Sequence, residues 1–251
     1  MASIVELCAI DTIEDQLIVD FQQHPLFARM NEMSRGEFLE ILLQRRFLSL
    51  SFVPLYELAL DALSDELAKK VVRSLIREEY DSGDALTHRE QLVHDLIAVG
   101  ATRNQILRCR ASRTTRNAIS ELLEAVCRTE RDDDDNSYQI SILSTLRLAG
   151  EILVAAEYEK FWPQLQRFGL SALQCPGKTE STFYYSHMSH DVRRYRIGSD
   201  PGLTCNRNHA DLMTERLRER LKLTSETGLE ACILASKRAQ RIKRGFYDQW
   251  L

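Results

Sequence analysis

Apolar residues recur at intervals of three and four positions along most of the chain, and this spacing predicts amphipathic α-helices. The helical intervals are long because only 10 Gly and 5 Pro interrupt 251 residues. No alternation of apolar and polar residues extends over several segments, as a sheet would require. The pattern therefore predicts an all-α fold, a bundle of about seven helices that forms one domain over residues 1–251.

Capping and turn signals predict where the helices begin and end. Ser34 and Glu37 have the spacing of a capping box, and Pro54 is expected to kink the helix that this box opens. The longest periodic run is expected to be the central helix of the bundle. The predicted helices cover residues 5–23, 34–63, 64–79, 88–99, 118–128, 138–168, 209–223 and 225–251, with a short helix starting at Thr102.

Charge and hydropathy exclude two broad classes of protein. The chain has 33 basic and 37 acidic residues, a formal charge of −4 and a pI near 5.9, which argues against a general nucleic-acid binder. The basic runs 108–116 and 237–244 lack interleaved aromatics and are expected to be solvated helix faces. No window approaches the roughly 20 apolar residues of a membrane span, so no membrane association is expected.

Cysteine usage indicates a reducing, cytoplasmic compartment. The six cysteines are far apart in sequence, no Cys-x-x-Cys pair occurs, and the N-terminus shows no signal-peptide pattern. The aspartate run 132–135 lacks the alternating ligands of a calcium loop and is expected to be a solvated loop.

The segment 183–195 combines aromatic residues with four polar side chains at helical spacing. His187, His190, Asp191 and Arg194 stand at i, i+3, i+4 and i+7, so a helix would place them on one stripe. A buried imidazole or carboxylate costs several kcal/mol unless it is paired or bound to a cation. The stripe therefore either faces water or faces a group that offsets the burial, such as a metal ion.

Two further polar clusters fall on runs that should pack inward. The first consists of residues 78–81, with Glu78, Glu79 and Asp81, followed by His88. The second is Glu157 and Glu159 on the predicted central helix, which point about 200° apart, so at most one of them enters the core. Each cluster alone fits an exposed helix face, but carboxylates and histidines on facing helices suit iron or manganese.

Together the three clusters resemble the haem-oxygenase-like dimetal oxidases, over roughly residues 34–194. Members show a Glu-Glu and Gly-containing segment followed by His, later a Glu with proline four residues on, and finally His-x-x-x-Asp-x-x-His. The resemblance implies a haem-oxygenase-like bundle that binds two Fe²⁺ ions. The implied ligands are Glu79, His88, Glu159, His187 and Asp191, with Glu78, Asp81 and His190 as competitors.

The chain departs from the family pattern at two points. The last histidine of the pattern falls on Arg194, so one iron is expected to be labile, to have fewer protein ligands, or to use His190 instead. The spacing from Glu79 to His88 is shorter than the commonest form. When the Gly-Asp pair at 83–84 is aligned with the family pattern, Glu79 falls at the ligand position and is therefore the first choice of ligand.

The resemblance implies an oxidase that reduces O2 with an external electron donor and oxidises a small molecule, with no catalytic groups beyond the metal ligands. Family substrates are amino acids or fatty acids, and the basic residues Arg193, Arg194 and Arg196 favour an amino-acid carboxylate. One branch converts a halogenated tryptophan to an indole carbonitrile, and Trp162 and Tyr184 would stack on an indole there. The expected substrate-binding residues are therefore Arg194, Trp162 and Tyr184, in a protein that could form a homodimer.

Three alternatives stay open from the sequence. A metal-free relative resembling thiaminase-II hydrolases or the pyrroloquinoline-quinone synthase would use the same bundle with a catalytic cysteine or a basic cavity. A diiron fatty-acid decarboxylase would need a long apolar tunnel. A helical interaction protein would expose all three polar clusters and bind no metal.

Overall fold

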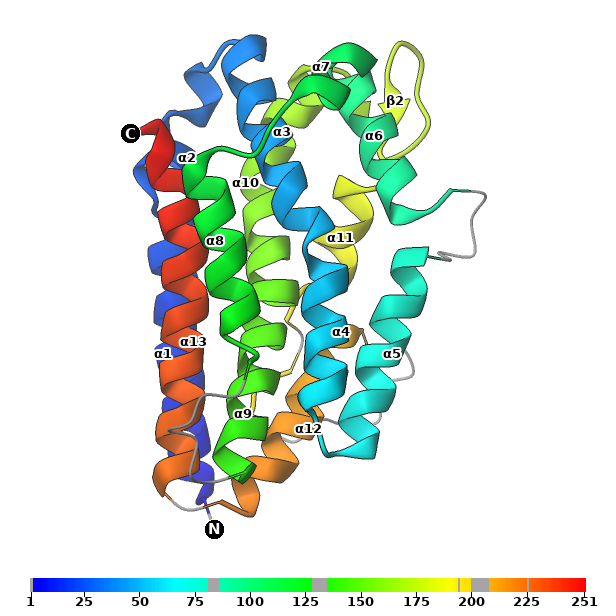
Figure 1. Ribbon diagram of the computed structural model, residues 1–251. Helices are drawn as coiled ribbons and strands as arrows, with labels where there is room; N and C mark the ends of the chain where they lie inside the picture. Colours follow the sequence, from blue (N-terminus) through cyan, green and yellow to red (C-terminus); the bar gives the residue numbers. More distant parts are fainter. Residues whose placement is uncertain (1, 81–85, 128–134, 194, 200–207, 225) are drawn as a thin grey trace.

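The computed structural model describes residues 2–80, 86–127, 135–193, 195–199, 208–224 and 226–251. These residues form α-helices and two strands of two residues each, so the predicted all-α fold is confirmed (Figure 1). The strands β1 (Leu170–Ser171) and β2 (Thr179–Glu180) pair in parallel. The helices are α1 (Ile4–Gln22), α2 (Pro25–Arg29), α3 (Arg35–Leu50), α4 (Phe52–Ala62), α5 (Glu66–Tyr80), α6 (His88–Ala98), α7 (Arg103–Arg108), α8 (Arg113–Glu124), α9 (Asp135–Thr145), α10 (Leu153–Arg167), α11 (Tyr184–His190), α12 (His209–Lys222) and α13 (Glu226–Tyr247).

The predicted central helix is present as a continuous run from α9 to α10. A π-helical segment, η2 (Leu146–Ile152), joins the two. Helix α13 packs along α9 and α1, and Figure 1 shows these helices side by side along the length of the bundle. In the described part of the chain, only the run 135–167 is long and apolar enough to span a membrane, and 94% of its apolar window is buried inside the protein. This helix therefore serves as the core helix of the bundle.

Two helix boundaries show how the cap and proline signals act. Ser34 accepts a hydrogen bond from the backbone of Glu37 and Glu37 bonds back to Ser34, as the capping box predicts. The predicted second helix divides at Ser51 into α3 and α4. Pro54 then lies in the first turn of α4, where its missing N–H costs no helical hydrogen bond.

The sequence predicted that one helix extends over residues 187–194, and this predicted helix is too long. Helix α11 ends at His190, and Asp191 is its C-cap residue. Asp191 nevertheless lies inside the protein with 5% of its surface exposed. The side chains at 187 and 191 therefore both reach the interior, but from a helix end rather than from one continuous helical face.

A buried ion cluster lies within the bundle between α3, α10 and α13. Glu157 accepts hydrogen bonds from Arg45 at 2.5 and 2.9 Å and from Lys243 at 2.7 Å. Burial alone raises the pKa of Glu157, but the charges of Arg45 and Lys243 reverse the effect and lower this pKa. Glu157 is therefore the glutamate of the 157/159 pair that enters the core, and it pairs with cations there.

Replacing Glu157 by Ala is expected to lower the free energy of unfolding by about 3–5 kcal/mol, because two buried cations lose their counter-ion. The matched control is Glu159→Ala on the same helix, whose exposed carboxylate should change stability by no more than about 0.5 kcal/mol. Urea unfolding monitored by circular dichroism measures both. Equal effects of the two substitutions would contradict the structural role given to Glu157.

Candidate metal centre

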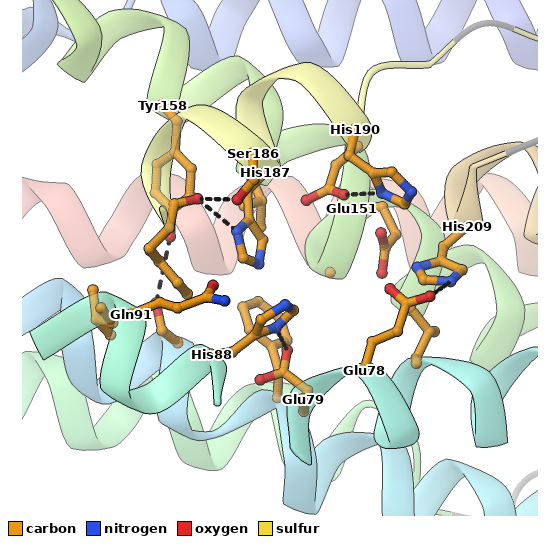
Figure 2. A pocket seen from close by; sticks show the side chains of 18 of the residues that line it. Glu78, Glu79, His88, Gln91, Glu151, Tyr158, Ser186, His187, His190 and His209 are labelled. Carbon is orange, nitrogen blue, oxygen red and sulfur yellow. Dashed lines mark hydrogen bonds and ion pairs between the residues drawn. The ribbon is translucent and has the colours of Figure 1, made fainter. Parts of the chain in front are cut away.

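A pocket of about 340 Å³ opens between α3, α4, α5, α6, η2, α10 and α11, and His209, the first residue of α12, also lines it. Histidines and carboxylates line it in two groups, and Figure 2 shows most of these side chains. The first group is Glu79, His88 and His187. The second consists of Glu78, Glu151, His190, Asp191 and His209.

The first group brings together three residues that are distant in sequence. One ligand atom from each of Glu79, His88 and His187 lies within 4.8 Å of the other two. His88 Nδ1 lies 3.5 Å from Glu79 Oε1, and the rings of His88 and His187 have centroids 4.9 Å apart. Figure 2 shows the three side chains turned toward one another. We call this group subsite 1.

The hydrogen bonding of His187 leaves one ring nitrogen directed to the pocket. His187 Nδ1 lies 2.8 Å from the carbonyl oxygen of Phe183, which can only accept, so Nδ1 carries the proton and Nε2 has a free lone pair. Burial and the neighbouring His88 lower the pKa of His187 to about 4, so this imidazole is neutral at pH 7. A neutral imidazole with one fixed N–H is the form that binds a metal.

The second group lies beside subsite 1, on the side of the pocket that is closer to α12. His209 Nε2 lies 3.1 Å from Glu78 Oε1, and His190 Nδ1 lies 3.2 Å from Asp191 Oδ1. Glu151 Oε1 accepts a hydrogen bond of 3.0 Å from the hydroxyl of Tyr56. The close approach of the Tyr56 hydroxyl to this helix depends on Gly150, because a Cβ atom at position 150 would lie 3.0 Å from that hydroxyl.

Among the described residues, no lysine or arginine pairs with the buried carboxylates Glu151 and Asp191 of the second group as Arg45 and Lys243 pair with Glu157. Burial and the nearby Asp191 raise the pKa of Glu151 to about 8. Burial, with the charges of Glu79 and Glu78, raises the pKa of Asp191 well above its ordinary value. In this site carboxylates that repel one another are held close in a low dielectric, and a bound cation would relieve that cost.

Asp95 of α6 fixes the position of α11. Its buried carboxylate accepts hydrogen bonds from Ser181 Oγ at 2.6 Å and from the backbone N–H groups of residues 182, 183 and 184 at 3.1 to 3.2 Å. These N–H groups form the N-terminal end of α11, where no intrahelical acceptor exists. One negative charge therefore couples the helix that carries His187 to the helix that carries His88.

Three predicted site residues lie elsewhere. Glu159 is exposed and accepts a hydrogen bond from Gln22 of α1, because it stands 100° around the helix from the pocket-lining Tyr158. Trp162 packs on the ring of Tyr185, and Tyr184 is buried against Tyr158, so neither lines the pocket. Asp81 and Arg194 lie outside the described residues.

Two of the basic residues that favoured an amino-acid substrate, Arg193 and Arg196, also point away from the pocket. Arg193 forms ion pairs with Asp11 and Asp15 of α1, and Arg196 pairs with Asp15 at 2.7 Å. These arginines tie the segment after α11 to α1. Among the described residues, the arginine that lines the pocket is Arg89, whose side chain is exposed.

Sequence reasoning missed Glu151, His209 and Tyr56. Glu151 carries a sequence signal, since it is an isolated carboxylate beside a glycine within the long apolar run 138–168. A buried carboxylate in such a run needs a partner. His209 and Tyr56 have no local signal, because each reaches the pocket only through the packing of the helices.

Comparison with known proteins identifies the fold but no family. No protein-family model and no curated protein matches the chain. It is similar in structure to a TenA family transcription regulator from Silicibacter sp. TM1040, with a TM-score of 0.55, 12% sequence identity, and coverage of 97% of this chain and 95% of that one. This neighbour shares the haem-oxygenase-like all-α fold, so the predicted fold type is confirmed.

Substitution of Asp95 by Asn is expected to lower the free energy of unfolding by about 1–3 kcal/mol, because the charged acceptor at the start of α11 is lost. The backbone amides at the start of α11 should also exchange faster with deuterium. Urea unfolding and hydrogen exchange measure these effects, with the exposed Asp61→Asn as control. Unchanged exchange in α11 would contradict the anchoring role.

The metal-free protein should lose stability as pH rises from 5 to 8. Glu151 keeps its proton up to about pH 8 when folded, whereas the unfolded chain releases it near pH 4.5. Stability from this group is thus present at low pH and is lost as the pH rises. Glu151→Gln should reduce the loss by about 1–3 kcal/mol, measured by urea unfolding with a chelator present. An identical loss in the variant would show that Glu151 does not titrate in this way.

Proposed function

We propose that this protein is a non-haem diiron oxidase that uses O2 to oxidise a small organic molecule. The observation that carries the proposal is the convergence of Glu79, His88 and His187 in one pocket. Two imidazoles and one carboxylate with open positions are typical of non-haem Fe²⁺ sites that react with dioxygen.

The donor atoms of subsite 1 are better placed to bind a metal ion than to hydrogen-bond to one another. His88 Nδ1 is buried and has no hydrogen-bond partner within the part of the chain that the structure describes, although Glu79 Oε1 lies 3.5 Å away. His187 is neutral at pH 7 and directs Nε2 toward the pocket. An ion bound here would satisfy the orphaned nitrogen of His88 and the carboxylate of Glu79 together.

Bound Fe²⁺ would supply the electrons that reduce dioxygen, and the protein would supply the site in which this happens. The carbonyl of Phe183 holds the His187 ring in one tautomer, and the ring of Tyr158 packs edge-on against it with centroids 6.2 Å apart. Apolar side chains, including Phe52, Leu92 and Val154, line the pocket and limit the access of water to the donor atoms. An external donor would return electrons after each cycle.

The pocket favours a small polar substrate such as an amino acid. Its volume of about 340 Å³ lies at the lower end of the range for ligand pockets. Arg89 at its edge offers a guanidinium to a substrate carboxylate, in place of the arginines at 193 and 196. A tryptophan-derived substrate, converted to a nitrile, is the narrower hypothesis, with Phe183 and Tyr158 as the aromatic walls.

The structural neighbour supports a second candidate, a metal-free enzyme of the thiaminase-II type on the same fold. Such an enzyme would need a nucleophile at the pocket. Within the described residues, the cysteines at 8, 109, 127, 175 and 232 do not line it, whereas histidines and carboxylates do. The composition of the pocket therefore favours the metal-dependent function.

Iron loading under anaerobic conditions, followed by elemental analysis and O2-consumption measurements, tests the proposal. Wild-type protein should retain close to two irons per chain, since two groups of ligands line the pocket. His187→Ala and Glu79→Ala should each bind less iron and consume less O2. Glu159→Ala is the matched control and should behave as wild type. Failure of the wild-type protein to bind iron would contradict the proposal and favour the metal-free candidate.

A further inference from the structure

The buried ion cluster of α3, α10 and α13 carries a net positive charge. Glu157 pairs with both Arg45 and Lys243, and among the described residues no second carboxylate pairs with either cation. Burial and the neighbouring Arg45 lower the pKa of the Lys243 ammonium group to about 8, so this group stays largely charged at pH 7. Two cations and one anion therefore leave one positive charge unbalanced inside the protein, and such a charge costs free energy.

This cluster lies behind one wall of the pocket. The rings of Phe52 and Tyr158 both line the pocket. Arg45 Cζ lies 5.3 Å from the ring centre of Tyr158 and 6.0 Å from that of Phe52, and Lys243 Nζ lies 5.9 Å from the ring centre of Phe52. At such a separation an unbalanced charge attracts an anion in the pocket, because few water molecules lie between them to screen it.

Two hydroxyl groups connect the cluster to the pocket. Arg45 Nη1 donates a hydrogen bond of 2.7 Å to Ser49 Oγ, and Ser49 lines the pocket. Ser49 Oγ lies 3.4 Å from the hydroxyl of Tyr158, which is longer than an ordinary O–H···O bond. Among the described residues, these two hydroxyls have no hydrogen-bond partners other than Arg45 and each other. At least one hydroxyl proton is therefore free for donation to a group in the pocket.

Positive and negative groups lie on different sides of subsite 1. In Figure 2, Tyr158 lies on one side of subsite 1, whereas Glu78 and His209 lie on the other. Burial lowers the pKa of Arg46 of α3, and the charge of Arg89 adds to this effect, so Arg89 also lies near α3. An anion in the pocket is therefore attracted toward the side of Tyr158 and repelled by the carboxylates of the second group.

We propose that the hydroxyls of Ser49 and Tyr158 bind the carboxylate of the substrate, and that the excess positive charge of the cluster behind them attracts it there. This inference rests on the proposed function and assigns the part of the pocket that binds the acid group. The two hydroxyls contact the substrate. Arg45 and Lys243 act through them and through their charge, so they are positioning residues, and Arg89 adds a further positive charge on the same side.

The other role of the cluster is structural. It would then only join α3, α10 and α13, and the hydroxyls of Ser49 and Tyr158 would hydrogen-bond to water. Removal of either hydroxyl would leave the binding of carboxylates unchanged. The preference of the protein for a carboxylate over a matched compound without one separates the two roles.

Calorimetric titration of the iron-loaded protein under anaerobic conditions tests the inference. The probes are L-tryptophan and L-leucine, each compared with the amine that lacks only the carboxylate, tryptamine and 3-methylbutylamine. Wild type should bind at least one amino acid more tightly than its amine. Ser49→Ala and Tyr158→Phe should each weaken the binding of that amino acid about tenfold to a hundredfold, as expected for a lost hydrogen bond to a charged group, and leave the binding of the amine unchanged.

Lys243→Met removes the excess charge and keeps the pair of Arg45 and Glu157. This substitution should reduce the same preference, although Lys243 is buried and does not line the pocket. The matched control is Ser189→Ala, because Ser189 lines the pocket from α11 and its hydroxyl donates to the carbonyl oxygen of Ser186. This control should bind the probes as wild type does, and circular dichroism checks that each variant folds.

An unchanged preference in folded Ser49→Ala and Tyr158→Phe would overturn the inference. A wild type that does not distinguish either amino acid from its amine would also overturn it. The iron content of the same samples tests the proposed function separately. A wild type without iron would contradict the proposed function, and the titrations would still decide whether the hydroxyls bind a carboxylate.

Discussion

The constraint on which the structure depends is that each carboxylate buried in the helical bundle needs a cation to balance its charge. Glu157 is matched by Arg45 and Lys243, and Glu14 is matched by Arg147 at 2.7 Å. Glu151 receives only a hydroxyl donor from Tyr56 and pairs with no lysine or arginine in the described part of the chain. A buried carboxylate without a cation costs several kcal/mol, and the repulsion from Asp191 adds to the cost.

This difference separates structural from functional polar residues. The two matched glutamates join helices within the core, where their charges are satisfied. The unmatched carboxylates lie at one pocket, together with imidazoles, and they raise the free energy of the empty site. A bound metal ion would offset that cost, and the relief of the repulsion between the carboxylates would contribute to the free energy of metal binding.

The sequence predicted the helices from local patterns, and it predicted that Glu79, His88 and His187 belong to one site, which the structure brings together. Capping boxes fix helix starts within a few residues. The three site residues were selected by resemblance to a family motif, although the spacing from Glu79 to His88 is shorter than the commonest form of that motif. The sequence placed Glu159 of the central helix in the site, whereas the glutamate that lines the pocket is Glu151, because the π-helical segment at 146–152 is not visible in the apolar pattern. His209 could not be predicted, since the contact with Glu78 joins helices far apart in the chain. The fold itself says little about chemistry, because a neighbour at 12% identity shares only the bundle.

A crystal structure of the iron-loaded protein, with anomalous diffraction recorded at the iron absorption edge, tests the central claim most directly. The account predicts two anomalous peaks roughly 3.5–4 Å apart. One peak would lie among Glu79, His88 and His187, and the other beside Glu151. Peaks at the protein surface, or an empty pocket in crystals that contain iron elsewhere, would contradict the account.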